Sequence, residues 1–299
     1  MCGIAGLFIK DKALEPQLGD YLAKMTSTLC SRGPDSAGFA IYGTGQDGKT
    51  KITIAGPTEG YDIAGAAQKL VDAIDSKADV TRRHSHAVIT LASAEVSKAT
   101  AWLATHLPDV TVMSEGQRLE IYKEVGYPDD VAKEFRIADM SGTHGISHTR
   151  MATESAVTTN GAHPFSTGSD QCLVHNGSLS NHASLRRELR RDGIKIRTEN
   201  DSEVAAGYLT RQMQSGQSLG EALNASLNDL DGFFTFVVGT ETGFGVLRDP
   251  IACKPAVMAE TDQYVAFASE YKSLTCLPGI KTARVWEPKP ATVYFWEHT

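Results

Sequence analysis

The sequence predicts an α+β globular protein: three observations indicate a globular chain with strand-like and helix-like segments, and motifs further along the chain imply the α+β class by resemblance. The 299 residues leave room for two ordinary domains, or for one large domain that carries an insertion. Hydrophobic residues make up 41% of the chain and charged residues 22%, without the compositional bias of a disordered protein. Short apolar segments typical of strands alternate with amphipathic segments typical of helices. Motifs described below then indicate the architecture.

Charge and hydropathy exclude two classes of partner. The chain has 36 acidic and 29 basic side chains, a formal charge of −7, which argues against general nucleic-acid binding. Its longest apolar runs, such as residues 232–239, are far shorter than the roughly 20 residues that span a bilayer. The N-terminus has neither a basic region before its apolar stretch nor a cleavage pattern after it. We therefore expect a cytoplasmic protein without a membrane segment.

The five cysteines do not indicate a disulfide framework or a metal site. They are odd in number, widely spaced and form no CxxC pair. Cys172, Cys253 and Cys276 have apolar or turn neighbours, and we interpret them as structural thiols. The nine histidines give no support for a metal site either.

Cys2 stands apart because it follows the initiator methionine directly. Removal of Met1 would leave a free α-amine beside the thiol, with a reference pKa of about 7.7 to 8.0, so the amine could act as the base for its own nucleophile. Residues 3–9 are predicted to form a short buried strand that would aim the thiol rigidly. Any small residue can follow Met1, so further segments must support this interpretation.

The opening MCGIAGLF resembles the N-terminus of the class II glutamine amidotransferases, which are N-terminal-nucleophile (Ntn) hydrolases with cysteine as their first mature residue. The resemblance implies a four-layer αββα sandwich, with two antiparallel sheets packed face to face between helices. It also implies L-glutamine as the substrate and Cys2 as the nucleophile that forms a thioester.

The segment RGPDSAG, residues 32–38, lies between an amphipathic stretch at 18–29 and a predicted strand at 39–42. It is similar to the family's RGxDSAG motif, which implies that Arg32 lies beside the nucleophile and orders the site. A tight turn without function is the alternative for this segment alone.

The segment SHTRMAT, residues 147–153, resembles the family's HTRxAT motif. The resemblance implies that Arg150 binds the α-carboxylate of glutamine, with Thr153 in support. A planar guanidinium suits this task because it can donate two parallel hydrogen bonds to a carboxylate. Met151 stands where many family members have an aromatic residue, and a surface ion pair is the alternative for Arg150 alone.

The segments AHPF at 162–165 and HNG at 175–177 are similar to two further elements of the family. They imply that the Asn176 side-chain amide and the Gly177 N–H stabilise the oxyanion of acyl transfer, and that His175 belongs to the substrate site. From the residues alone we expect a strand that runs into a glycine turn, and a plain hairpin turn is the alternative.

The segment TENDSEV, residues 198–204, begins a predicted helix with an acidic first turn. It resembles a family segment whose aspartate binds the α-ammonium of glutamine, a role that falls on Asp201; a simple N-cap is the alternative. Arg150 and Asp201 would together select an L-amino acid head group.

Two more segments resemble parts of the family that support the fold more than the chemistry. They are RDPIACKP at 248–255 and ASE at 268–270.

About 100 residues separate Gly43 from Gly142, roughly twice the number usual in small domains of this family. We therefore predict one amidotransferase domain over residues 1–299, interrupted at about 45–140 by a small α/β subdomain. Its predicted elements are strands at 50–56 and 86–92 and helices at 62–76 and 94–107. His84 and His86 are expected in an exposed, solvated run.

The long insertion and the sequence of residues 147–182 resemble those of the glutamate-synthase-like branch of the family. This branch includes the amidotransferase subunits of N-methylglutamate synthases. This resemblance implies a hetero-oligomer with a flavin-binding synthase subunit and a β-helical subunit. No cofactor is expected in this chain, whereas FMN and an iron–sulfur cluster would belong to the partners. No dinucleotide fingerprint or P-loop is visible in the sequence.

Two other functions stay open at this stage. The chain could be a non-catalytic glutamine-binding or structural subunit of such a complex. It could also be an amidohydrolase for another amide, although the Arg150 and Asp201 pair argues against this because it requires an amino-acid head group.

Overall fold

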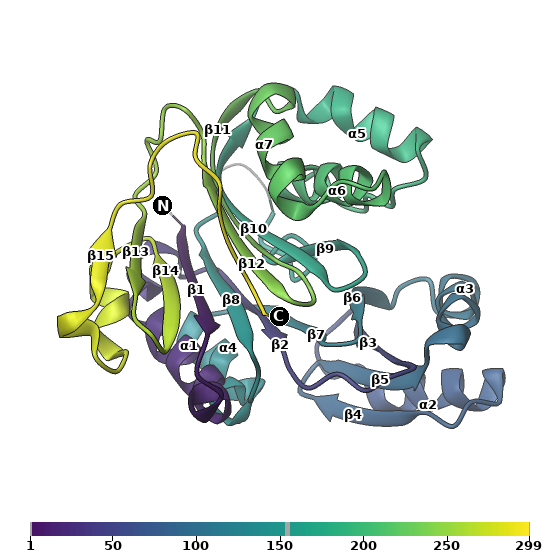
Figure 1. The fold of residues 1–299 in the computed structure, drawn as a ribbon. Coiled ribbons are helices and arrows are strands. Elements are labelled where there is room, and N and C mark those ends of the chain that lie inside the picture. Colours follow the sequence, from purple (N-terminus) through teal and green to yellow (C-terminus); the bar gives the residue numbers. More distant parts are fainter. Residues whose placement is uncertain (1, 153–155, 299) are drawn as a thin grey trace.

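The computed structural model describes residues 2–152 and 156–298 and contains three antiparallel sheets (Figure 1). The seven-stranded sheet has the order β15 (Arg284–Trp286), β13 (Val257–Glu260), β14 (Tyr264–Ala268), β1 (Gly3–Ile9), β8 (His144–Arg150), β2 (Ser36–Tyr42), β7 (Leu119–Val125). The five-stranded sheet has the order β16 (Tyr294–Glu297), β12 (Gly243–Arg248), β11 (Gly232–Gly239), β10 (Gln171–Leu179), β9 (Phe165–Gly168).

These two sheets pack face to face between two layers of helices, which confirms the predicted four-layer sandwich. The helices α1 (Leu18–Ser27) and α4 (Pro128–Glu134) cover the seven-stranded sheet. The helices α5 (His182–Arg191), α6 (Asp201–Gln214) and α7 (Leu219–Asp229) cover the five-stranded sheet (Figure 1). The apolar side chains between the layers form three separate cores.

Strand β1 has the predicted bounds and is buried along its whole length. Because side chains alternate along a strand, Leu7 faces α1, whereas Ile4 and Phe8 face the other sheet. Gly6 lets the two sheets approach closely, since a Cβ there would lie 2.7 Å from the Phe244 ring. The strand that follows the predicted nucleophile is thus fixed between two cores.

The third sheet forms a compact unit with its own apolar core. Its order is β4 (Asp79–Arg83), β5 (His86–Ala92), β3 (Lys49–Ala55), β6 (Thr111–Gly116), and it is covered by α2 (Ile63–Ile74) and α3 (Val96–His106). These elements include the four predicted between residues 50 and 107. Strand β4 was not predicted, because its short sequence DVTRR is exposed and mostly charged.

Residues 119–140, which we expected within the insertion, lie instead on the main sandwich. Strand β7 pairs with β2 along the edge of the seven-stranded sheet, and α4 packs beside α1. The separate sheet therefore spans residues 49–116. Cross-strand pairing, which the local pattern does not reveal, determines this boundary.

The expectation of a solvated RRHSH run is wrong for His86. Its side chain is fully buried and packs edge-on against Phe135, with ring centroids 4.8 Å apart. Burial lowers the pKa of His86 to about 3, so the imidazole is neutral. His84, by contrast, is partly exposed and lies 3.5 Å from the carboxylate of Glu134.

Asp170, in the turn between β9 and β10, joins the inserted unit to the five-stranded sheet. Its buried carboxylate accepts hydrogen bonds from the backbone N–H groups of Gln117, Arg118 and Leu119, at 2.7, 2.9 and 2.9 Å. Its own N–H donates to the carbonyl of Glu115. The end of β6 is therefore held firmly against the main domain.

The part of the chain that the structure describes has no helix with both the length and the apolar character needed to cross a membrane.

Candidate active site

Cys2 lies at the start of β1, half-buried, where the two large sheets meet. Its Sγ accepts a hydrogen bond from the Met151 N–H at 3.4 Å. Its carbonyl oxygen accepts one hydrogen bond from Arg32 Nε at 3.1 Å and another from Asn176 Nδ2 at 3.2 Å. The fold thus brings three predicted site residues, 2, 32 and 176, into direct contact.

Arg32 is held by a carboxylate on the far side of its guanidinium. Arg32 Nη1 lies 2.6 Å from Glu270 Oε1, and this hydrogen bond lowers the pKa of Glu270 below its usual range. The adjacent Ser269 Oγ accepts a hydrogen bond from the Ile4 N–H at 2.9 Å. The ASE segment, which we expected to support only the fold, therefore also positions Arg32 and the first residues of β1.

His148 orients the amide of Asn176. Its Nε2 lies 3.2 Å from Asn176 Oδ1, and burial lowers the pKa of His148 to about 3, so a neutral ring donates from Nε2. With the amide oxygen occupied, Asn176 Nδ2 faces the Cys2 carbonyl. His148 was not predicted from the sequence, although this residue lies two positions before Arg150 and hence on the same face of β8.

Asn176 and Gly177 lie within a strand, not in the glycine turn that we expected. Strand β10 continues to Leu179, and Gly177 is paired with Phe234 of β11. A Cβ at Gly177 would lie 1.9 Å from the carbonyl oxygen of Phe233, so no larger residue fits there. A local turn signal was overridden by pairing between strands.

The pairing also indicates the direction of the Gly177 N–H. On the side of β12, the Phe234 N–H donates to the Asp249 carboxylate, and the Phe234 carbonyl accepts the Asp249 N–H. In an antiparallel ladder, Gly177 opposite it then points its N–H away from β11. Leu179, two residues on, points the same way and donates to Asp201 Oδ2 at 2.9 Å. The Gly177 N–H and the Asp201 carboxylate therefore lie along the same edge of β10.

His175 points to the opposite side of β10 from Asn176. Its buried imidazole Nδ1 lies 2.9 Å from Ser202 Oγ and 3.8 Å from Asp201 Oδ1, at the start of α6. Burial lowers the pKa of His175, and the Asp201 charge opposes that shift. A contribution of His175 to substrate binding would therefore act through Ser202 and Asp201.

Asp201 is not the N-cap of α6. Asn200 caps the helix, because its side-chain oxygen accepts the Ser202 N–H at 2.9 Å. The Asp201 carboxylate is thereby left at the edge of β10, next to the site. The alternative of an N-cap is therefore wrong for Asp201, and its role in substrate binding stays a prediction.

Arg150 ends β8 and is buried beside the loop of residues 156–164. Its Nη1 donates to the carbonyl of Ala156 at 3.4 Å, and its own carbonyl accepts the Asp35 N–H at 3.0 Å. Asp35, in the RGPDSAG segment, also accepts the Ala152 N–H through its carboxylate at 2.8 Å. Thr153, the other residue predicted for this corner, lies outside the described residues.

Lys123 on β7 anchors the loop beside Arg150. Its buried ammonium donates to the carbonyls of Asn160, Ala162 and Pro164 at 3.4, 2.7 and 3.2 Å. Burial lowers the pKa of Lys123 to about 7. Lys123 is a second supporting residue that the sequence analysis missed, because nothing in its local pattern indicates burial.

Within the described residues, no group of three or more His, Cys, Asp or Glu side chains is placed to hold a metal ion. The groups that converge at Cys2 are the Met151 N–H, the Asn176 amide and the Arg32 guanidinium, which is paired with Glu270. Hydrogen-bond donors placed in this way beside a thiol can stabilise an oxyanion.

Comparison with known proteins connects these residues to a family. The family model described as "Glutamine amidotransferase domain" matches residues 148–276. The chain is 61% identical over 298 residues to "Glutamine amidotransferase-like protein GlxB" of Rhizobium meliloti, covering 100% of this chain and 99% of that protein. It is 36% identical to a "Putative glutamine amidotransferase" of Methanothermobacter thermautotrophicus, and this match covers 99% of this chain and 100% of that protein.

Among solved structures, the chain is similar to glutamine phosphoribosylpyrophosphate amidotransferase from B. subtilis. The TM-score is 0.61 at 18% identity, and the match covers 99% of this chain and 47% of that longer chain. At this level of identity the similarity concerns the fold alone.

We predict that Lys123 makes stability depend on pH. Since its pKa falls from 10.5 to about 7 on folding, the unfolded chain holds the extra proton between these values. The contribution of Lys123 to the free energy of unfolding should therefore rise with pH from about 7 to about 10, and fall as pH is lowered again. Urea unfolding across this range measures the free energy of unfolding of wild type and of Lys123→Met. The value for wild type minus the value for Lys123→Met should rise with pH.

Lys133→Met is the matched control, because Lys133 is exposed on α4. Its difference from wild type should stay nearly constant over the same range. A constant difference for Lys123→Met as well would show that the buried amine keeps its ordinary pKa.

Proposed function

Because this chain belongs to the glutamine amidotransferase family, we propose that it hydrolyses the side-chain amide of L-glutamine to give glutamate and ammonia, with Cys2 as the nucleophile. One observation carries the proposal. Arg32 and Asn176 both bind the carbonyl oxygen of Cys2, so residues distant in sequence converge on the predicted nucleophile.

In the proposed mechanism, Cys2 becomes the first residue once Met1 is removed, and its α-amine accepts the thiol proton. The thiolate attacks the glutamine amide carbon and forms a tetrahedral oxyanion. The Asn176 amide and the Gly177 N–H stabilise this oxyanion. The amine then returns its proton to the leaving nitrogen, ammonia departs, and water hydrolyses the thioester to glutamate.

His148 and Glu270 act in this scheme as positioning residues. The neutral His148 ring keeps the Asn176 amide oriented with its N–H groups toward Cys2, where the negative charge develops. Glu270 holds the Arg32 guanidinium against the Cys2 carbonyl. These donors are fixed before substrate arrives, so little reorganisation is needed during the reaction.

Substrate selection rests in this proposal on two opposite charges. Arg150 would bind the α-carboxylate and Asp201 the α-ammonium of glutamine, from β8 and α6 respectively. A simple amide lacks both groups and would make neither of these contacts, which favours glutaminase activity over hydrolysis of other amides.

We further propose that the ammonia is used by other chains of a glutamate-synthase-like complex, such as N-methylglutamate synthase. The long insertion and the sequence of residues 147–182 support this branch. Purification of the tagged protein from its native source tests the proposal: a flavin-binding chain and a β-helical chain should copurify. Recovery of the chain alone under gentle conditions would argue against the complex.

We predict that a diazo-ketone analogue of glutamine labels Cys2 once. Intact mass should show loss of Met1 and a single adduct, and peptide mapping should place the adduct on Cys2. Cys2→Ala should take up no label and should lose at least about 10³-fold in kcat, because the nucleophile is gone. Coupled detection of glutamate measures the rate, with isolated protein and with the native complex.

Cys253→Ala is the control, because Cys253 is an exposed thiol that belongs to no part of the site. It should label and react as wild type does. Retained Met1 and no adduct, in the native complex as well, would favour a non-catalytic glutamine-binding or structural subunit.

We predict that Asp201→Asn raises the KM for glutamine by about 10-fold or more with a smaller effect on kcat, since a hydrogen bond to a charged group contributes about 1.5–3 kcal/mol. Asp192→Asn, at the exposed C-cap of α5, should leave both constants unchanged. An unchanged KM in Asp201→Asn would remove this residue from the binding site.

A further inference from the structure

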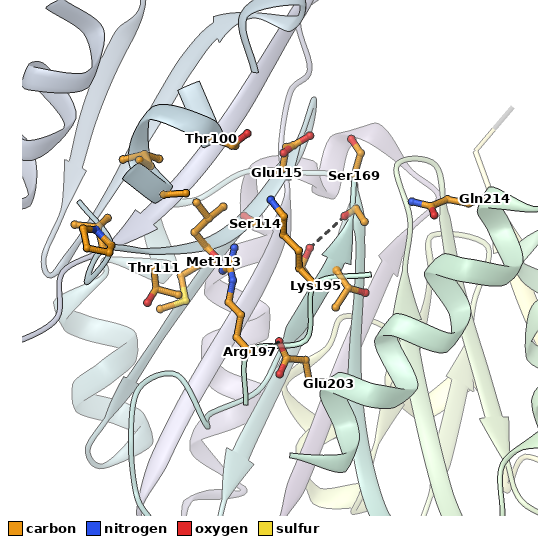
Figure 2. A pocket seen from close by; sticks show the side chains of 18 residues that line it. Thr100, Thr111, Met113, Ser114, Glu115, Ser169, Lys195, Arg197, Glu203 and Gln214 are labelled. Carbon is orange, nitrogen blue, oxygen red and sulfur yellow. Dashed lines mark hydrogen bonds between the residues drawn. The ribbon is translucent and has the colours of Figure 1, made fainter. Parts of the chain in front are cut away.

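A cavity of about 620 Å³ lies between the inserted sheet and the main domain (Figure 2). Strand β6 and the end of α3 form one side, and β9 with residues 195–203 forms the other. A smaller space of about 30 Å³ shares part of its lining and extends toward Lys123 and Asn160. The larger volume falls in the range of small-molecule sites, roughly 300–1,000 Å³.

The two sides of the cavity differ in chemistry. The inserted unit contributes the apolar side chains of the lining, among them Leu103, Pro108 and Val112, together with polar groups such as Thr100 and Ser114. The main domain contributes hydroxyl groups from Ser166 and Thr167. Because Asp170 fixes the end of β6 against the main domain, the two walls are held at a set distance.

Two cationic side chains extend along the cavity, Lys195 and Arg197 (Figure 2). They alternate with Ile194 and Ile196, which are buried in the core beneath α6. The alternation therefore turns both isoleucines inward and both cations toward the cavity. Among the described residues, no ion pair with a carboxylate is found for Lys195 or Arg197 within 4.0 Å; Arg197 Nη1 donates instead to the Val112 carbonyl.

The acids that line the cavity leave these cations available. The Glu203 carboxylate is occupied by the backbone N–H groups of Arg197 and Thr198, at 2.9 and 2.6 Å, and by the Thr198 hydroxyl at 2.7 Å. Burial raises the pKa of Glu115, the other acid in the lining, and the charge of Lys195 opposes that shift, although the two side chains form no ion pair within 4.0 Å among the described residues. Lys195 and Arg197 can therefore both face an anionic group in the cavity.

We propose that this cavity is a binding site, separate from the glutamine site, for a small molecule with an apolar body and an anionic head group. The body packs against the apolar side chains of α3 and β6. The carboxylate or phosphate head lies between Lys195 and Arg197. A guanidinium and an ammonium on one wall suit either anion.

The position of the cavity couples it to glutamine binding, an inference that rests on the proposed function. Arg197 and Thr198 are held by Glu203 of α6, and the same loop continues through the N-cap Asn200 to Asp201. A ligand that draws Arg197 toward it would shift the start of α6 and the carboxylate assigned to the α-ammonium. The site would therefore act as an effector site that changes glutamine affinity.

Calorimetric titration with phenyl phosphate and with phenylacetate tests the site directly. Both probes carry an aromatic body and an anion, and phenol and inorganic phosphate are the matched half-probes. At least one of the two complete probes should bind at millimolar concentration or better, and bind more tightly than either half-probe. The Lys195→Gln/Arg197→Gln double variant should lose at least about tenfold in affinity, as expected for losing one charged hydrogen bond or more.

Two more variants keep the test decisive. Ala104→Trp fills the cavity from its exposed rim and should block binding without removing a charge. Lys133→Gln, on α4 away from the cavity, should bind as wild type does. Failure of both complete probes to bind wild type, or equal binding by the double variant, would overturn the site; equal binding by inorganic phosphate alone would reduce it to an adventitious anion.

Coupling is measured separately, as glutamine affinity of Cys2→Ala with and without the bound probe. A change in glutamine affinity of threefold or more is the expected result. If the probe binds and glutamine affinity does not change, the effector role fails while the binding site stands. If glutamine hydrolysis itself is absent, the proposed function fails, and probe binding still decides the inference about the cavity.

Discussion

The hydrogen bond from Asn176 to the carbonyl oxygen of Cys2 is the contact on which the arrangement of the site depends, because it joins the two large sheets at the predicted nucleophile. Asn176 belongs to β10 of one sheet, and Cys2 precedes β1 of the other. The amide is held at its other end by His148 of β8. Any change in the spacing of the sheets would therefore move the predicted oxyanion donors relative to the thiol.

Close packing around this contact explains several small residues in the motifs. Gly6 admits the Phe244 ring between the sheets, and Gly177 lies directly against the backbone of β11. At both positions a Cβ would come closer than 3.0 Å to a neighbouring atom, so a side chain would separate the strands. Gly6 thus makes room for an aromatic ring between the sheets and Gly177 for the neighbouring backbone, and neither glycine forms a turn.

The start of α6 links the site to the inserted unit. Its first turn holds Asp201 at the edge of β10 and Glu203 beneath the loop that carries Arg197. The loop in turn reaches the cavity walled by β6 and α3. The inserted unit is therefore connected to the predicted substrate site through one helix terminus.

The sequence by itself determined the candidate nucleophile, the motif order and most elements, because these depend on residue identity and local periodicity. Strand β1 begins and ends where its apolar run does, and Arg32 lies at Cys2 as the motif resemblance implied. Only the tertiary structure placed His148 on the Asn176 amide and Glu270 on Arg32. Register between strands distant in sequence decides such contacts, and a single local pattern does not encode that register.

The same reason accounts for the expectations that were wrong. His86 is buried because β5 turns it toward Phe135, and Asn176 continues a strand because β11 pairs beside it. Lys123 is buried because β7 joins the main sheet rather than the inserted one. Burial depends on which elements meet, so the sequence determined the chemistry available to the site, and the packing of the sheets decided which groups supply it.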